Sequence, residues 1–501
     1  MAKIKLNGKE IEVDGKQKLL QICLDQGAFV PHYCWHPGLT PAGNCRMCLV
    51  KVSNSRKLEV SCMYPVAEGM EVWTEGPEVE AGRKAVLEYM LINHPLDCPI
   101  CDKAGECDLQ DYTYAYRKGL SRFEEDKVIK HTKDLGPNIR IWGNRCIVCT
   151  RCVRFTEEVS GNGELCVINR GDRSVVDVFP GIPIDNPLSL NVVDLCPVGA
   201  LIDKNFMYAA RVWFTQKQQG VCASCSRGCN VEFTVLDNEI KRLVPRPNAD
   251  VNQHWMCDEG RLHTRYVASD RRLVTPAGSA TEIVAAGREI PLAGVLSTYA
   301  TVEEMWLFKK LMDALGVKDV GVLTLTRGER QVFKSGFAIE ADKTPNRAYA
   351  ERLFGRDAVD KGVAAVVDAL RAGRAKGLVV MNGIPDLDLP AELVEAARTA
   401  EFVAVSDLLR NPLEAVANVV LPSCAWAEKE GTFVNVDGRL QRTKKAVEPP
   451  PTARPEAEWL QEALVAAGER PAPLSAEGVF REAFPELDYG KVGPKGVALA
   501  R

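Results

Sequence analysis

The amino-acid sequence predicts an α+β N-terminal half, made of small cysteine-rich domains, followed by an α/β C-terminal domain. All but two of the 18 cysteines lie between Cys34 and Cys257, in groups with the spacing of metal-cluster ligands. From about Arg272 onward, segments with helical and strand-like patterns alternate. Such alternation is typical of a parallel sheet covered by helices.

Length and composition narrow the class of protein. A chain of 501 residues is too long for one hydrophobic core and is expected to divide into several domains. The net charge of −4 gives no reason to expect a nucleic-acid partner. No run approaches the apolar length of a membrane span, and Met1 to Val13 lacks the apolar region of a secretion signal. Cysteines grouped as C-x2-C in a chain without such a signal are expected to bind metal in a reducing compartment.

Short strands and one helix are expected in the first 78 residues. Alternating runs on either side of Asn7-Gly8 predict a β-hairpin, because both turn positions tolerate positive φ. A helix over 18–26 and strands over 49–52 and 70–73 follow. Together these elements resemble the β-grasp fold of plant-type [2Fe–2S] ferredoxins.

The first group of candidate ligands lies in this domain. It comprises Cys34, Cys45, Cys48 and Cys62. Gly43 lets the chain turn tightly, and the C-x2-C pair lets one loop provide two ligands. Ten residues separate the first two cysteines, unlike the plant-type C-x4-C-x2-C spacing. A zinc site is the alternative, although structural zinc favours two paired C-x2-C knuckles. Cys23 is interpreted as a buried helix residue.

The second group contains a histidine. It comprises His94, Cys98, Cys101 and Cys107. A helix over 78–93 ends at His94, since Pro95 follows. A lone histidine is more often a core or capping residue, but this one occupies the place where a fourth cysteine is missing. Imidazole replaces thiolate in other iron–sulfur centres and raises their potential.

The third group lacks a local fourth ligand. Three of its members are Cys146, Cys149 and Cys152. A two-cluster ferredoxin would have Cys-Pro four residues later, where this chain has Thr156. Cys196, followed by Pro197, is the predicted fourth ligand. Cys166 competes, but its strand-like surroundings favour a core position. Nearby arginines could offset negative charge or be ordinary surface residues: Arg151, Arg154 and Arg170.

The fourth group precedes the C-terminal domain. It comprises Cys222, Cys225, Cys229 and Cys257. Three ligands in one loop with a distant fourth suit a [4Fe–4S] cluster, although four thiolates would also satisfy zinc. The three preceding groups favour iron–sulfur here.

The C-terminal half carries no evident nucleotide site, because no glycine-rich phosphate motif stands at a strand end. Cys424 is expected to be structural. Prolines at 449–451 predict a linker before a last helix over 455–467, and the tail after Pro471 has few secondary-structure cues. Helices are expected over 302–314, 362–372 and 391–400, and strands over 230–236, 320–325, 377–381 and 402–406.

The four groups in this order closely resemble the large peripheral-arm iron–sulfur subunit (the 75 kDa homologue) of respiratory complex I, NADH:quinone oxidoreductase. The motifs Gly-Asn-Cys45-Arg-Met-Cys48, His94-Pro-Leu-Asp-Cys98 and Cys196-Pro-Val-Gly-Ala-Leu carry the resemblance. A weaker likeness, from Leu421 to Arg439, is to molybdopterin-oxidoreductase folds, which implies a truncated fold of that type.

The resemblance implies one [2Fe–2S] cluster on the first group and one [4Fe–4S] cluster on each of the other three. It implies neither FMN nor molybdopterin on this chain. The domains it implies are a β-grasp domain (1–78), a one-His three-Cys domain (79–120), a ferredoxin-like domain (121–215), a four-Cys domain (216–271), an α/β domain (272–450) and a C-terminal helix and tail (451–501).

Electron transfer is the function that the resemblance implies. In this family, electrons from NADH enter through FMN on a neighbouring subunit and pass along the clusters toward quinone, in a proton-translocating complex on the cytoplasmic side of the membrane. Expected partners are the FMN/NADH-binding subunit and other peripheral-arm subunits. The alternatives are an electron-transfer subunit of a soluble NAD-linked hydrogenase or formate dehydrogenase, and a zinc-rich structural module.

Overall fold

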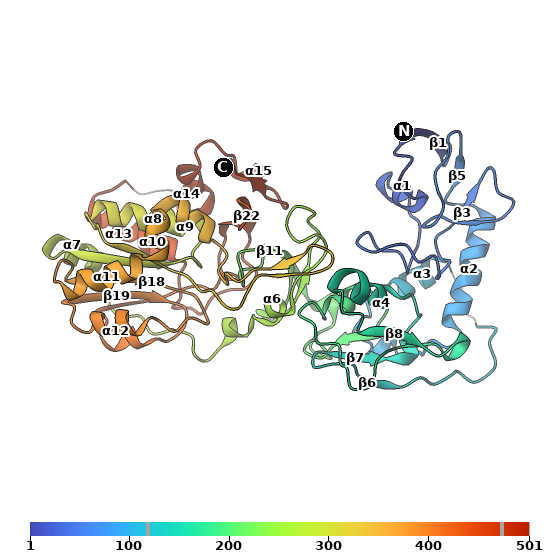
Figure 1. The fold of residues 1–501 in the computed structure, drawn as a ribbon, viewed down its shortest axis with the longest axis horizontal. Coiled ribbons are helices and arrows are strands. Elements are labelled where there is room, and N and C mark those ends of the chain that lie inside the picture. The colour runs from blue at the N-terminus through green and yellow to red at the C-terminus, as the bar shows by residue number, and fades with distance from the viewer. Residues whose placement is uncertain (117–120, 471–474, 500–501) are drawn as a thin grey trace. The chain divides into compact units, whose positions relative to one another are not determined.

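The computed structural model describes residues 1–116, 121–470 and 475–499. The end of the predicted 79–120 domain and the start of the predicted tail lie outside the described residues. The chain forms two compact units (Figure 1). Unit 1 is Met1–Thr215 with Phe333–Phe337, and unit 2 is Gln216–Val332 with Ala338–Arg501.

A five-stranded sheet forms the N-terminal part of unit 1, in the order β2-β1-β5-β3-β4. The predicted hairpin is present, with Asn7 and Gly8 both at positive φ. The helix α1 packs Leu19, Ile22 and Cys23 into the core beside the sheet. The elements are β1 (Ala2–Leu6), β2 (Lys9–Val13), α1 (Leu19–Asp25), β3 (Leu49–Val52), β4 (Glu59–Val60) and β5 (Glu71–Trp73).

Short elements make up the rest of unit 1, with sheets in the orders β10-β7-β6 and β8-β9. The longest helix, α2, ends before His94, as the sequence predicts. The regular elements are α2 (Pro77–Leu91), α3 (Asp108–Tyr116), β6 (Thr132–Asp134), β7 (Ile139–Trp142), α4 (Arg151–Phe155), β8 (Leu165–Ile168), β9 (Val175–Val178), α5 (Asn191–Leu195) and β10 (Leu201–Asp203). The single turns are η1 (Cys98–Ile100), η2 (Gly143–Arg145), η3 (Thr156–Ser160), η4 (Gly171–Arg173) and η5 (Val212–Phe214).

Unit 2 is built on a five-stranded parallel sheet in the order β15-β14-β18-β19-β20. Figure 1 shows α13 and α12 on opposite sides of this sheet. Every residue of β14 and β18 is buried, as expected for parallel strands covered on both faces. The elements are α7 (Ala280–Glu289), β14 (Leu292–Ser297), α8 (Val302–Ala314), β15 (Val320–Leu323), α9 (Arg347–Phe354), α10 (Arg356–Asp360), α11 (Gly362–Arg371), β18 (Gly377–Met381), α12 (Ala391–Ala397), β19 (Phe402–Asp407), η7 (Pro412–Ala415), β20 (Val419–Pro422) and α13 (Glu456–Ala467).

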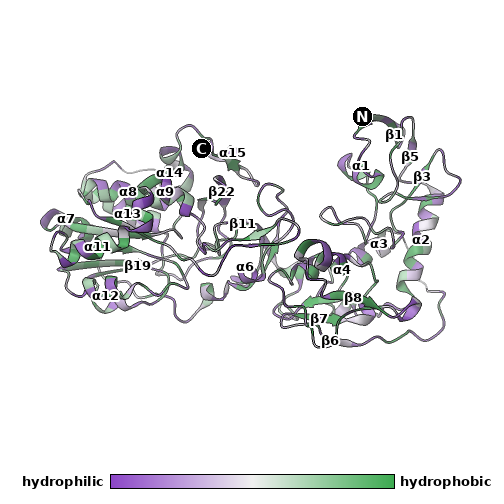
Figure 2. Cartoon of the chain, in the orientation of Figure 1, coloured by the Kyte–Doolittle hydropathy of each residue, from purple (hydrophilic) through white to green (hydrophobic). Residues whose placement is uncertain are grey.

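Smaller antiparallel sheets complete unit 2, in the orders β11-β12-β13, β16-β17 and β21-β22-β23. Their elements and the remaining helices are β11 (Gln216–Val221), β12 (Asn230–Leu236), β13 (Glu239–Pro245), α6 (Asp258–Leu262), η6 (Arg265–Ala268), β16 (Gln331–Val332), β17 (Ala338–Ile339), β21 (Gly431–Val434), β22 (Arg439–Thr443), α14 (Ala476–Ala483), α15 (Tyr489–Val492) and β23 (Val497–Ala498). Hydrophobic and hydrophilic residues alternate along helices such as α2 (Figure 2). Among the described residues, no helix has the length and apolar character needed to cross a membrane.

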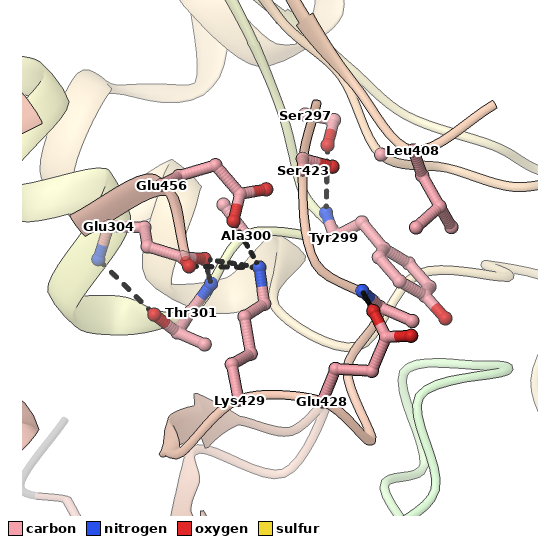
Figure 3. A network of polar contacts seen from close by, with 12 residues as sticks. Ser297, Tyr299, Ala300, Thr301, Glu304, Leu408, Ser423, Glu428, Lys429 and Glu456 are labelled. Carbon is pink, nitrogen blue, oxygen red and sulfur yellow. Dashed lines mark hydrogen bonds and ion pairs between the residues drawn. The ribbon is translucent and has the colours of Figure 1, made fainter. Parts of the chain in front are cut away.

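A buried ionic network joins three segments of unit 2 (Figure 3). Lys429 Nζ lies 2.9 Å from carboxylate oxygens of both Glu304 and Glu456. Glu304 also accepts a hydrogen bond from the backbone N–H of Thr301, which caps α8. Burial and the nearby Glu304 raise the pKa of Glu456 to about 8. The network fixes the starts of α8 and α13 against the loop that carries Lys429. Removing one partner of such a pair typically costs about 3–5 kcal/mol.

Glu303 gives unit 2 a pH-dependent stability. Burial raises its pKa to about 7, although both carboxylate oxygens accept hydrogen bonds from Thr432 at 2.9 Å. A raised carboxyl pKa stabilises the folded state fully below the unfolded value, and this contribution is lost as pH rises toward the folded value.

We therefore expect Glu303→Gln to gain stability relative to the natural chain, by about 1–3 kcal/mol, as pH rises from 5 to 8. Calorimetric unfolding of the full chain at several pH values measures this difference. The exposed Glu329→Gln provides the control, because its side chain stays in water. A difference between Glu303→Gln and the natural chain that is constant with pH would contradict the assignment.

Candidate functional site

The predicted ligands form four groups, each close in space. In the described part of the chain, no group of three or more His, Cys, Asp or Glu side chains is arranged to hold a single metal ion. The groupings below therefore rest on the contacts of individual thiols. None of the 18 cysteines forms a disulfide.

The first site is a contiguous set of buried thiols. Cys34 hydrogen-bonds Cys45 and Cys62, and Cys62 also hydrogen-bonds Cys48. The bond with Cys62 lowers the pKa of Cys48 to about 7, and bonds with Cys45 and Cys62 lower the pKa of Cys34 still further. The backbone N–H of Cys34 also donates to Cys45 Sγ at 3.4 Å. This set of four therefore favours thiolates at some of its members.

The second site is the most open of the four. His94, Cys98 and Cys107 line one pocket, and Cys101 interacts electrostatically with both neighbouring cysteines. Cys98 is exposed, whereas Cys101 and Cys107 are buried. Burial, with a smaller contribution from the positive charge of Arg145, lowers the pKa of His94 to about 4. His94 is therefore neutral at pH 7, which is the form that binds metal.

The third site surrounds a small cavity. Its lining includes Cys146, Cys149, Cys152 and Cys196 together with apolar side chains. Cys166, the competitor for the fourth position, is absent from that lining. Burial raises the pKa of Cys146 to about 11 and that of Cys149 to about 12. Binding of a cation would reverse this effect, because it favours the thiolates that burial disfavours.

The fourth site lies in unit 2 and is buried throughout. Cys229 interacts electrostatically with all three other members, Cys222, Cys225 and Cys257. A methyl group on Gly260 would lie 3.0 Å from Cys222 Sγ and 3.3 Å from Cys257 Sγ, so these two thiols approach the same backbone position. The backbone N–H of Gly260 donates to Cys257 Sγ at 3.2 Å.

One hydrogen-bond pattern recurs at all four sites. The backbone N–H two residues after a cysteine donates to that cysteine's sulfur: Met47 to Cys45, Lys103 to Cys101, Val148 to Cys146, Arg151 to Cys149, Ser224 to Cys222 and Arg227 to Cys225. Amide donors to sulfur stabilise thiolate and are one of the means by which proteins tune iron–sulfur clusters. The donor set therefore fits sulfur-ligated clusters.

Unusual backbone conformations produce this pattern at the third site. Val148 and Thr150 both have positive φ, although each is β-branched. Such residues rarely adopt the left-handed region, and the strain persists only where the surroundings enforce it. The curled loop directs its amides toward the sulfurs, as Val148 N shows by donating to Cys146 Sγ at 3.4 Å.

Two buried arginines connect the first and third sites. Arg154 donates to the carbonyl oxygens of Cys34 and Thr40, and more weakly to that of Cys149 at 3.5 Å. Arg151 donates to Trp35 O at 2.6 Å and to Leu195 O at 3.2 Å. Both side chains are thus interior groups that hold ligand loops together.

Several remaining predictions have clear outcomes. Arg170 is exposed, as the surface alternative for the arginines expected. Cys23 and Cys424 are buried, as predicted. The core position predicted for Cys166 is wrong, because β8 pairs only with β9 and leaves that side chain partly exposed.

Residues between the second and third sites were not foreseen. Gly199 follows Cys196 closely, and a methyl group there would lie 2.1 Å from Cys101 Sγ. Arg145, the residue before Cys146, is buried and bonds Asp97 near Cys98. Their proximity to ligands in the sequence was the available signal, but the partner sites lie far away along the chain.

The close approach at Gly199 predicts a selective defect. Gly199→Ala places a methyl group against Cys101, and overpacking of this kind costs about 1–3 kcal/mol. We expect iron content and paramagnetic resonance (EPR) signals from the second site to fall while those of the first site persist. Gly15→Ala is the matched control, since the nearest atom to its added methyl is 4.0 Å away. Retention of the second-site signal in Gly199→Ala would contradict this account.

Comparison with known families finds matches along most of the chain. A 2Fe-2S iron-sulfur cluster binding domain matches residues 1–77, and an NADH-ubiquinone oxidoreductase-G iron-sulfur binding region matches 83–121. The ferredoxin-like domain of NADH-quinone oxidoreductase subunit 3 matches 136–202. The molybdopterin oxidoreductase Fe4S4 domain and molybdopterin oxidoreductase match 215–269 and 356–463. These matches confirm the predicted [2Fe–2S], [4Fe–4S] and molybdopterin-oxidoreductase-like regions.

Similar proteins include subunits of NADH-quinone oxidoreductase from several organisms. One such subunit, from Rickettsia felis, is 36% identical over 337 residues, which is 64% of this chain and 50% of that protein. The NADH-ubiquinone oxidoreductase 75 kDa subunit of Reclinomonas americana is 39% identical, over 63% of this chain and 48% of that protein. The chain thus spans about half the length of these curated relatives.

A solved structure is also similar in part. The crystal structure of an NAD+-reducing [NiFe]-hydrogenase in the H2-reduced state is 27% identical and covers 42% of this chain and 91% of that one. Its TM-score of 0.38 is too low to carry an argument. The family matches and the sequence relatives agree with each other: over about two thirds of its length, the chain is a relative of the 75 kDa iron–sulfur subunits of NADH-quinone oxidoreductase.

Proposed function

We propose that this chain is an iron–sulfur electron-transfer subunit of NADH-quinone oxidoreductase. The relatives of that name and the series of iron–sulfur family matches support the proposal. The alternative of a soluble hydrogenase or formate dehydrogenase subunit is supported only by a structural likeness too loose to argue from.

The proposed ligands are the four groups described above, with one [2Fe–2S] cluster on the first and one [4Fe–4S] cluster on each of the others. When bound, such clusters take up and release single electrons at potentials set by their ligands and surroundings. The observation that carries the proposal is the third site, where Cys196 joins three distant cysteines around one cavity. We expect neither FMN nor molybdopterin on this chain.

The chain's own residues have three tasks in this function. Burial of most of the thiols keeps water from the sites, which limits the reorganisation that accompanies a change of charge. Amide N–H groups stabilise the sulfurs. Arg151 and Arg154 hold the first and third ligand loops together, so that the separation of the two sites is fixed.

The finer architecture belongs to the same proposal. We interpret the five-stranded N-terminal sheet with α1 as a β-grasp domain, and the parallel sheet of unit 2 as part of a molybdopterin-oxidoreductase-like fold. The six domain ranges set out from the sequence remain our proposed division. Proposed partners are the FMN/NADH-binding subunit and other peripheral-arm subunits. The chain would act in this assembly at the cytoplasmic side of the membrane, in electron transfer toward quinone.

Analysis of bound iron and acid-labile sulfide in the anaerobically purified chain tests this function. One [2Fe–2S] and three [4Fe–4S] clusters correspond to about 14 iron atoms per chain. A zinc-rich scaffold would contain about four zinc atoms and almost no iron.

The ligand assignment of the third site has its own test. We expect Cys196→Ser to lose about four iron atoms and one EPR signal, because a hydroxyl replaces a required thiolate. Cys166→Ser is the matched control and is expected to retain both, since Cys166 does not line the cavity. The opposite result, with iron lost only from Cys166→Ser, would overturn the assignment of Cys196.

A further inference from the structure

Arg145 is a buried cation in the interior of unit 1. Its side chain is 2% exposed, and its Nε lies 2.9 Å from Asp97 Oδ2. Its guanidinium carbon lies 4.2 Å from the centre of the Trp142 ring, close enough for a cation–π interaction. These two contacts fix the position of the guanidinium, and Trp142 and Arg145 both flank η2 just before the first ligand of the third site.

The guanidinium faces the second site although it belongs to the loop of the third. A methyl group on Gly199 would lie 2.1 Å from Cys101 Sγ and 3.8 Å from Cδ of Arg145, so the two side chains border one small space. The positive charge of Arg145 acts to lower the pKa values of His94 and Cys101. The cation that lowers the pKa of Cys146, its neighbour in sequence, is Lys130 instead.

Arg145 is not fully compensated by its neighbours. Its Nη2 is buried and has no hydrogen-bond partner among the described residues. Burying an unmatched N–H of a charged group costs free energy. Asp97, its ion-pair partner, is 30% exposed, so water weakens the negative charge more than the positive one. A net positive field therefore remains on the inner side of the second site.

We infer that Arg145 is a positioning residue of the second site, where its fixed positive charge makes the uptake of an electron more favourable. This inference rests on the proposed function. Reduction adds one electron from an external donor and makes the site more negative by one unit of charge. Arginine keeps its own charge at physiological pH, so no proton need accompany that electron. A fixed cation nearby stabilises the reduced form more than the oxidised form.

Potentiometric EPR titration of the anaerobically purified full chain, with dithionite as the electron donor, tests the inference. We expect Arg145→Gln to reduce the equilibrium constant for one-electron reduction of the second site at least tenfold, a fall of about 59 mV in midpoint potential. Arg145→Lys should recover at least half of this loss. Asp97→Asn should shift the potential the opposite way, because it leaves the charge of Arg145 unopposed.

Two controls separate charge from general damage. Arg83→Gln removes another buried arginine of unit 1, bonded to Tyr116 and Leu49 O, and should leave the second-site potential unchanged. The third-site signal is an internal control and should shift less than the second.

The outcomes decide the inference. Shifts of opposite sign in Arg145→Gln and Asp97→Asn support it. Shifts of the same sign, or none, overturn it. If Arg145→Gln fails to hold iron at the second site, Asp97→Asn decides alone: a rise in potential supports the inference, and no rise overturns it. If the natural chain itself shows no cluster signal, the proposed function fails first, and that result is distinct from an unshifted signal in the variants.

Discussion

The structure depends on burying sulfur against sulfur. Thiols that face one another in a low-dielectric interior oppose each other's ionisation, and their raised pKa values at the third and fourth sites show this opposition. The chain meets the constraint with backbone amides directed at the sulfurs, even where this requires Val148 and Thr150 to adopt strained conformations. A protein that needed only buried, neutral cysteines would have no reason to place amide donors beside them. The loops are therefore shaped for anionic sulfur.

The ligand loop of the third site connects the three sites of unit 1. At its beginning, Arg145 reaches Asp97 beside the second site, and at its end Arg151 and Arg154 reach backbone carbonyls around the first. Asn44 adds a contact from the first loop, donating to Val148 O at 3.4 Å. Because the arginines bind carbonyl groups, they set the distance between loops without supplying a ligand. The spacing of the sites is thus a property of this one segment.

Much of this arrangement could be predicted from the sequence, and the failures have physical causes. The hairpin, α1, α8 and β18 were predicted within a residue or two at each end, because turn residues and hydrophobic periodicity define them locally. The central strand β14 was not predicted. Its run contains Ala293 and Gly294, and the glycine is needed because Met312 Sδ would lie 2.7 Å from an added methyl group. Candidate ligands could be grouped by spacing, and Cys196 by its following proline. By contrast, the contacts of Arg145 and Gly199 join segments about 50 and 100 residues apart along the chain, and one sequence without relatives contains no signal for such pairs.

The exposure of Cys98 has a consequence for handling the protein. Among the cysteines, all of which lie in the described residues, only Cys98 is exposed. Dissolved oxygen and peroxide therefore meet the second site before the enclosed ones, and oxidation of sulfur follows accessibility. Damage by air begins at the histidine-containing centre, so an aged preparation loses that centre while the others still contribute colour.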